Sequence, residues 1–217
     1  MIHGNSPKIL AVLLVALLFQ AVSFGAEDEA KPIENNPLNK EALAKKVDRV
    51  IDVIMWDPNY EADKESVTYY VRGTEVATRF DRTYPPIKNP RMQIDMEAQR
   101  IIGRFKGTIA GNTITGEWNI KALPHKTFQK GPKVQYEIET SSTTTQNMKT
   151  VLEEDGTVTV TATGKTVMNY KRGPNAPEVC EERPTRTIDC SIPPSPECKP
   201  PGAPEGKPYT GTWKDWK

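Results

Sequence analysis

The residue types best suited to proton transfer are scarce in this chain of 217 residues. Its two histidines are His3 and His125, and His3 lies in an N-terminal segment that we expect to be removed. A catalytic nucleophile needs a neighbouring base, most often a histidine. The sequence predicts a loop from Lys121 to Pro132, in which His125 would be exposed to solvent. Histidine-dependent nucleophilic catalysis and a histidine metal site are therefore disfavoured.

Carboxylate chemistry has one local candidate, the adjacent acids Glu153, Glu154 and Asp155. We expect them to form a solvated hairpin turn, with loose calcium binding as the alternative, because they lack the alternating ligand spacing of calcium loops. Carboxylate pairs of the glycoside hydrolase type come from distant segments, and nothing in the sequence singles out such a pair. Phosphate-binding loops and dinucleotide fingerprints are absent from the sequence. We therefore predict that the protein is not an enzyme and has neither cofactor nor metal.

The three cysteines, Cys180, Cys190 and Cys198, lie close together near the C-terminus. In an oxidising compartment we expect one intramolecular disulfide, and the pair Cys180 and Cys190 is favoured among the three possible pairings. The remaining cysteine would stay a free thiol or would join two chains. A zinc site is disfavoured because the spacing lacks a short C-x-x-C pair.

The first 25 residues are predicted to be a secretory signal peptide. Lys8 precedes an apolar run from Ile9 to Phe19, and Ser23 and Gly25 are the small residues before a cut after Gly25. The alternative is a short membrane anchor, but the run is shorter than the roughly 20 residues that cross a bilayer. We expect a secreted or periplasmic protein without stable membrane insertion after cleavage.

The charge balance argues against nucleic acid or an anionic membrane as the main partner. The chain has 29 basic and 28 acidic side chains, and loss of residues 1–25 would remove Lys8 and no acid. The mature chain would therefore be neutral, and no basic block stands out along the sequence.

The strongest structural pattern is a β-hairpin from Arg100 to Ile120. Its turn is Gly111-Asn112, because both residues accept the positive φ of a two-residue turn. One register then separates an apolar face from a polar face, as a half-buried sheet requires. The predicted pairs are Ile109 with Ile114, Gly107 with Gly116 and Phe105 with Trp118 on the apolar face, and Thr108 with Thr115, Lys106 with Glu117 and Arg104 with Asn119 on the other.

The glycines of this hairpin suggest a binding site between aromatic walls. They omit side chains beside two aromatic rings, which would leave room for a small apolar ligand. The alternative is that the helix or a large side chain such as Met92 or Tyr136 fills this room, and strand glycines also mark bends. The candidate ligand-binding residues are Phe105, Gly107, Gly116 and Trp118.

The region before the first hairpin is predicted to contain a helix. Residues 26–36 are acidic and polar, and we expect them to be disordered. From Pro37 to Met55 apolar residues recur at i, i+3 and i+4, which indicates an amphipathic helix ended by Asp57-Pro58. Its apolar side would pack on the sheet or, alternatively, bind a partner.

The remaining alternating segments are predicted to be strands. A hairpin about Arg72-Gly73 is followed by a strand from Met92 to Met96, which would place Met96 opposite Ile101 through a turn at Ala98-Gln99. From Lys133 to Arg172 we predict a meander of four strands, with a glycan-bearing linker at 141–145 as the alternative. Its three loops would end at Asn147, Gly156 and Gly164.

These elements predict a mainly β domain over residues 37–172. We expect an antiparallel up-and-down β-barrel or a two-sheet sandwich of about eight to nine strands with one N-terminal amphipathic helix. Residues 173–217 would form a proline-rich, cysteine-containing tail. Trp213 and Trp216 in this tail are a large apolar load, so a final short strand is expected to dock on the sheet.

The segment Gly107 to Trp118, GTIAGNTITGEW, resembles the repeated Gly-x-Ile-x-Gly-Asn-x-Ile-x-Gly hairpins of bacterial extracytoplasmic lipocalin-like β-barrel proteins. The resemblance covers one hairpin and implies an extracytoplasmic β-barrel. It carries over no functional residue, since most such proteins are themselves uncharacterised.

We therefore expect an exported, non-enzymatic β-domain protein with a binding, interaction or envelope structural role. Its tail, its odd cysteine and its tryptophans Trp213 and Trp216 would contact an envelope or extracellular protein or a polysaccharide. The alternative is a carrier that holds a small apolar ligand in a lipocalin-like cavity.

Overall fold

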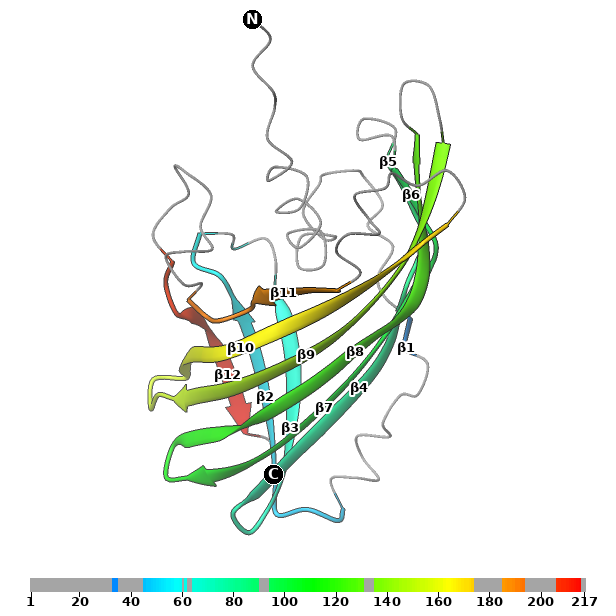
Figure 1. Ribbon diagram of the computed structural model, residues 1–217. Helices are drawn as coiled ribbons and strands as arrows, with labels where there is room; N and C mark the ends of the chain where they lie inside the picture. Colours follow the sequence, from blue (N-terminus) through cyan, green and yellow to red (C-terminus); the bar gives the residue numbers. More distant parts are fainter. Residues whose placement is uncertain are drawn as a thin grey trace, which may run out of the picture.

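All the regular structure in the described part of the chain is antiparallel β-sheet (Figure 1). The computed structural model describes residues 33–34, 45–59, 61, 64–89, 94–130, 135–173, 185–193 and 206–215. The strands are β1 (Ile33–Glu34), β2 (Arg49–Trp56), β3 (Glu65–Arg72), β4 (Glu75–Tyr84), β5 (Ile87–Asn89), β6 (Ile94–Met96), β7 (Gln99–Ala110), β8 (Thr113–Lys130), β9 (Gln135–Leu152), β10 (Thr157–Arg172), β11 (Thr185–Asp189) and β12 (Tyr209–Asp215).

Hydrogen bonding joins eight of these strands into a closed ring. Around the ring the order is β2, β3, β4, β7, β8, β9, β10 and β12, and β12 pairs again with β2. Strands that follow one another along the chain are neighbours, apart from the inserted β5, β6 and β11. The predicted mainly β, antiparallel fold is confirmed, and the ring-like pairing makes it barrel-like.

The ring is uneven because its strands differ in length. β8 and β9 have 18 residues each, whereas β2 and β3 have 8 and β12 has 7. The long strands therefore continue beyond the level at which the ring closes, as a curved sheet (Figure 1). On the same edge of β10, β12 pairs with residues 157–160 and β11 with residues 165–169. We call the part spanned by β2, β3 and β12 the closed end, and the part beyond it the extended sheet.

The central hairpin has the predicted register in every pair. β7 and β8 place Phe105 opposite Trp118, Gly107 opposite Gly116 and Lys106 opposite Glu117. Gly111 in the turn has φ 58°, a conformation that glycine adopts without steric cost. The hairpin of β3 and β4 is confirmed as well, with Arg72 opposite Glu75.

The predicted helix from Pro37 to Met55 is wrong over its second half. Residues 49–56 form β2, and residues 37–44 lie outside the described residues. Val47, Val50, Ile51 and Ile54 have helical spacing, whereas Ile51, Val53 and Met55 alternate as in a strand and are buried. β-branched side chains favour the strand, and pairing with β3 and β12 on both sides decides between the two.

Three further predictions are corrected by the long strands. Met96 in β6 lies opposite Ile87 and Thr127, on β5 and β8, and not opposite Ile101. The segment predicted as a loop from Lys121 is the second half of β8, which continues to Lys130 across a β-bulge between Ala122 and His125.

The predicted four-strand meander is in fact the single hairpin of β9 and β10. Asn147 and Gly164 lie inside continuous strands, opposite Thr163 and Gln146, and only the turn at Gly156 is present. Residues 141–145 belong to β9, so the linker alternative is wrong too. Asparagine and glycine tolerate a turn but do not require one, and pairing on both sides keeps these strands straight.

The last strand closes the ring, as its tryptophan content predicts. Trp213 lies opposite Val53 on β2, and its indole nitrogen donates a hydrogen bond of 2.8 Å to the carbonyl of Glu153. Arg49 Nε donates to the Asp215 carboxylate at 2.7 Å and fixes the end of the same strand. The segment between β10 and β12 contributes β11, which the sequence did not predict. Trp216 lies outside the described residues.

The closed end is filled by the apolar core. Alternate residues of each ring strand point inward, so that buried aliphatic side chains from β2, β3, β9 and β10 surround a group of aromatic rings. Among the described residues there is no helix long and apolar enough to cross a membrane. The core residues are Ile51, Val53, Met55, Tyr69, Val71, Val76, Phe105, Ile109, Ile114, Trp118, Met148, Leu152, Val158, Val160, Ala162 and Ile192.

Candidate functional site

The aromatic residues of the predicted binding site lie inside the ring and are packed. Phe105 is 1% exposed and Trp118 is 4% exposed, and their ring centroids are 5.4 Å apart. Tyr69 meets Phe105 edge-on at 5.3 Å, and Phe80 lies 5.6 Å from Trp118. These are the separations of well-packed aromatic pairs. Burial raises the pKa of Tyr69 to about 12, which agrees with a dry, apolar surrounding.

The glycines beside these rings do not leave room for a ligand. A Cβ atom on Gly107 would overlap the carbonyl of Thr115 and would lie 2.8 Å from Cα of Gly116. A Cβ on Gly116 would lie 2.5 Å from the ring of Phe105, and one on Gly103 would overlap the ring of Phe80. The glycines therefore permit close strand approach and aromatic packing. The space is filled, as in the alternative we considered, and Phe80 is the side chain that fills it beside Gly103.

Above the aromatic group, the inner face of the extended sheet becomes polar. On β9 every second residue from Thr140 to Gln146 is buried and polar. Thr144 and Thr166 share a hydrogen bond of 2.8 Å, and Gln146 Nε2 donates to the carbonyl of Cys190 at 2.7 Å. Gln99 on β7 is 8% exposed, and its Nε2 has no hydrogen-bond partner among the described residues. An unpaired buried amide costs free energy, so Gln99 is a point where a ligand could contribute an acceptor.

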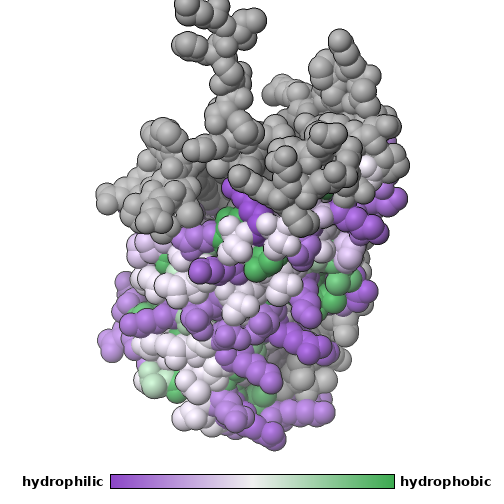
Figure 2. Space-filling view, in the orientation of Figure 1, coloured by the Kyte–Doolittle hydropathy of each residue, from purple (hydrophilic) through white to green (hydrophobic). Residues whose placement is uncertain are grey.

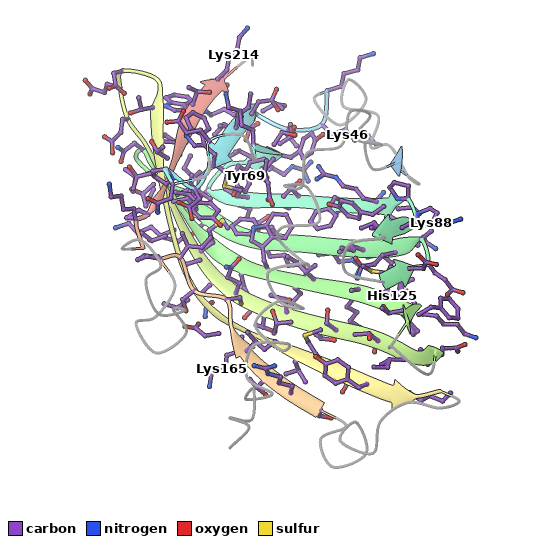
Figure 3. All side chains as sticks on the ribbon, turned by 90° about the horizontal axis from the view of Figure 1, so that it is seen from above. Lys46, Tyr69, Lys88, His125, Lys165 and Lys214 are labelled. Carbon is purple, nitrogen blue, oxygen red and sulfur yellow. The ribbon has the colours of Figure 1, made fainter. Side chains whose placement is uncertain are left out.

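His125 also belongs to this polar part of the inner face, which corrects the prediction of an exposed loop residue. The β-bulge turns it inward opposite Thr140, and it is 6% exposed. Figure 3 shows His125 near the far ends of the strands, away from Tyr69. Burial lowers the pKa of His125, while Nδ1, 3.3 Å from the carbonyl of Leu123, and the charge of Glu97 act in the opposite direction. In the described structure His125 makes no hydrogen bond to a nucleophilic side chain.

The other candidates for chemistry occupy structural positions. Asp155 accepts hydrogen bonds from the backbone and hydroxyl of Thr157, which lowers the pKa of Asp155 and caps the turn between β9 and β10. Within the described residues no group of His, Cys, Asp or Glu side chains is arranged to hold a metal. Cys190 is half-buried, and burial raises the pKa of its thiol. Cys180 and Cys198 lie outside the described residues, so the disulfide stays a prediction.

One cleft of the described structure lies outside the ring. An open groove of about 800 Å³ crosses the outer face of β7 to β10 and ends at the segment that carries Ser191. Its walls combine hydroxyl, amide and charged side chains with apolar surface from residues such as Met148, Ala162, Ile192 and Pro193, and no aromatic residue lines it. The lining residues are Lys106, Thr115, Gly116, Glu117, Asn147, Met148, Lys149, Thr161, Ala162, Thr163, Ser191, Ile192 and Pro193.

The groove belongs to a larger cationic surface, which we call the outer face. It consists of the outward residues of β4, β7, β8, β9 and β10 in the four rows from that of Glu75 to that of Asp81 and Lys121. Six cationic side chains lie on it against three carboxylates, Glu75, Asp81 and Glu117, and Asp81 forms an ion pair with Arg100 at 2.6 Å. Figure 2 views the molecule from the side of β8 to β10 and shows mainly hydrophilic and intermediate residues there. The cationic residues are Arg79, Arg104, Lys106, Lys121, Lys149 and Lys165, all exposed.

One row of the outer face concentrates these charges. Arg79 lies directly opposite Arg104, and the same row continues across the sheet through Asn119 and Thr145 to Lys165, which faces Asp189 on β11. Glu117, in the next row, lies opposite Lys106 and accepts a hydrogen bond of 2.6 Å from Asn119. In the described structure no ion pair engages any of the six cations.

Comparison with protein-family models, with curated proteins and with solved structures gave no match. The resemblance of Gly107 to Trp118 to lipocalin-like proteins therefore stays a prediction. The four predicted binding residues form two cross-strand pairs, as the register predicted, but the glycines leave no room for a ligand, and the outer face was not predicted. The alternation Thr157, Thr159, Thr161, Thr163 was a usable signal for an exposed polar strand face. The charge clustering arises only from register across five strands.

Proposed function

We propose that the protein is an exported, non-enzymatic binding protein that attaches to an extended polymer through its outer face. The observation that carries this proposal is the groove over β7 to β10, where exposed hydroxyl, amide and charged side chains lie beside apolar surface. The closed end of the ring is packed, which favours a role of the core in stability. An open groove on a rigid sheet suits a long partner that extends beyond the protein at both sides, and not a small molecule that must be enclosed.

The attachment differs from the one expected from the sequence, where the tail and its tryptophans were the contact. Trp213 is engaged in β12, with its indole hydrogen-bonded to Glu153, and is therefore not available as a surface anchor. The outer face replaces it as the interaction surface. Export itself, and the cut after Gly25, remain part of the proposal.

The groove can be blocked by one side chain without touching the core. In Thr163→Trp an exposed position of the groove lining receives a large ring. Thr212→Trp is the matched control, because Thr212 is exposed on β12, opposite Ile54, and does not line the groove. Both variants should keep the melting temperature of the mature protein within a few degrees.

Native gels cast with soluble polysaccharides test the proposal. The probes are alginate, polygalacturonate, dextran sulfate, xylan and dextran, with the mature chain from Ala26 as the sample. We expect at least one polymer to retard the wild type and Thr212→Trp, and to retard Thr163→Trp much less. If none of the polymers changes the mobility, or if Thr163→Trp is retarded like the wild type, the outer face is not the attachment surface.

A second candidate is the carrier function, for which the inner face of the extended sheet offers one observation. Gln99 Nε2 lacks an acceptor among the described residues, and His125 and Thr140 lie on the same buried polar face. Such a ligand would need a polar group, in contrast to the purely apolar ligand expected from the sequence. Native mass spectrometry of the mature protein would detect it as an extra mass that is lost on denaturation, and Gln99→Met should abolish that mass. The bare mass alone would remove this candidate.

A further inference from the structure

We infer that the polymer held by the outer face is an acidic polysaccharide, an inference that rests on the proposed function. Its evidence is the segregation of charge. The chain as a whole is close to neutral, with 29 basic and 28 acidic side chains. The outer face nevertheless carries six cations and three carboxylates, and one of these carboxylates, Asp81, is already paired with Arg100.

The cations are close enough to act together on one polyanion. Neighbouring strands are about 4.8 Å apart, so the row from Arg79 to Lys165 extends over roughly 19 Å of the curved sheet. The separation between Arg104 and its neighbours on adjacent strands is well within the screening length of about 8 Å at physiological salt. Lys106 and Lys149 add charge within the groove itself. A chain of regularly spaced carboxylate or sulfate groups matches this arrangement.

The pair Arg79 and Arg104 indicates that an anionic group would bind between these two side chains. Two arginines directly opposite each other on neighbouring strands repel, and no ion pair in the described structure joins a carboxylate to either one. Guanidinium groups bind carboxylate and sulfate through two parallel hydrogen bonds. A bound anionic group between Arg79 and Arg104 would remove the repulsion.

The other side chains of the outer face favour a polysaccharide over other polyanions. Thr115, Asn147 and Thr163 line the groove with hydroxyl and amide groups, which suit the hydroxyls of sugars. Single-stranded nucleic acid is held by aromatic stacking, and the outward positions of the described outer face contain no aromatic residue. Binding to a lipid surface uses inserted Trp, Phe or Leu side chains, and these are absent there too.

The test compares neutralised variants on defined polymers. The triple variant Arg104→Gln, Lys106→Gln, Lys149→Gln removes three charges from the outer face. Lys214→Gln is the control, because Lys214 is exposed on β12 and lies on the opposite side of the ring from Lys165 in Figure 3. Polygalacturonate and dextran sulfate are the acidic probes, and dextran is the neutral one. Anionic phospholipid vesicles and a single-stranded oligonucleotide complete the set.

We expect polygalacturonate or dextran sulfate to bind the wild type, with an affinity that falls steeply as salt is raised. An exposed ion pair contributes a factor of about 1.5 to 5, so the triple variant should bind roughly 3- to 100-fold more weakly. Lys214→Gln should bind like the wild type, and dextran should not bind. Binding of dextran that is lost in Thr163→Trp would overturn the acidic class and leave the proposed function intact. Equal or tighter binding of the vesicles or the oligonucleotide, weakened by the same variant, would also overturn it.

Discussion

Closure of the ring by β12 makes a quantitative prediction for Trp213. This side chain is half-buried against the core, lies opposite Val53 and donates a hydrogen bond of 2.8 Å to the Glu153 carbonyl. Truncation of a fully buried tryptophan to alanine costs about 3–5 kcal/mol, so a half-buried one should cost about 2–3 kcal/mol in packing. The lost hydrogen bond adds about 1 kcal/mol. Trp213→Ala should therefore lower the free energy of unfolding by about 3–4 kcal/mol.

Thermal unfolding of three variants separates the two contributions. For a chain of this length 1 kcal/mol corresponds to about 2–4 °C, so Trp213→Ala should lower the melting temperature by roughly 6–16 °C. Trp213→Phe keeps most of the packing and loses the hydrogen bond, which predicts a fall of about 2–4 °C. Lys214→Ala, on the exposed side of the same strand, should stay within about 0.5 kcal/mol. If Trp213→Ala behaved like Lys214→Ala, β12 would not close the ring in solution.

Three further substitutions test other parts of the structure. The folded state lowers the pKa of His125 below its ordinary 6.5, so the unfolded chain takes up a proton first as the pH falls. The free energy of unfolding should be constant above about pH 6.5 and should decrease below it by at most about 1.4 kcal/mol per pH unit. In chemical denaturation curves, His125→Gln should remove this pH dependence between about pH 6.5 and 5. Gly107→Ala should lower the free energy of unfolding by about 3 kcal/mol, because the new Cβ overlaps the Thr115 carbonyl. Gly111→Ala is the control and should cost about 1 kcal/mol, because only the φ of 58° is unfavourable there. Equal losses in the two variants would refute the close approach of the strands at Gly107. Arg104→Gln should raise the free energy of unfolding by a few tenths of a kcal/mol at low salt and leave it unchanged at about 1 M salt. A salt-independent change would exclude repulsion by Arg79 as its cause.

The sequence predicted best where several local signals agree. In the central hairpin the turn glycine, the apolar alternation and the cross-strand charges all demand one register, and a slip by one residue would bury Lys106 and Glu117. β2 shows the opposite case, because Val50, Ile51 and Ile54 have helical spacing while Ile51, Val53 and Met55 alternate as in a strand. The partners that decide for the strand are β3 and β12, and β12 lies more than 150 residues away along the chain.

The long strands show why turn signals alone mislead. Gly164 lies opposite Gln146, and a Cβ there would approach Cα of Gln146 to 2.7 Å, so this glycine permits close pairing in the middle of a strand. The same residue type forms the real turn at Gly156, where φ is 86°. Sequence alone does not separate these uses, because the difference lies in the neighbouring strand. The burial of His125 has a similar origin, since a β-bulge changes which face its side chain occupies.

The outer face was not predicted for the same reason, because its charges come together only through the register of five strands. Along each long strand the inward residues are constrained by packing and by hydrogen bonds such as that between Thr144 and Thr166. The outward residues are free of these constraints, and threonine there serves strand formation. Arg79 opposite Arg104 does not serve stability, since like charges in this position repel. A local arrangement that opposes folding persists where a function requires it, which is the strongest reason to look for the anion that these two arginines would share.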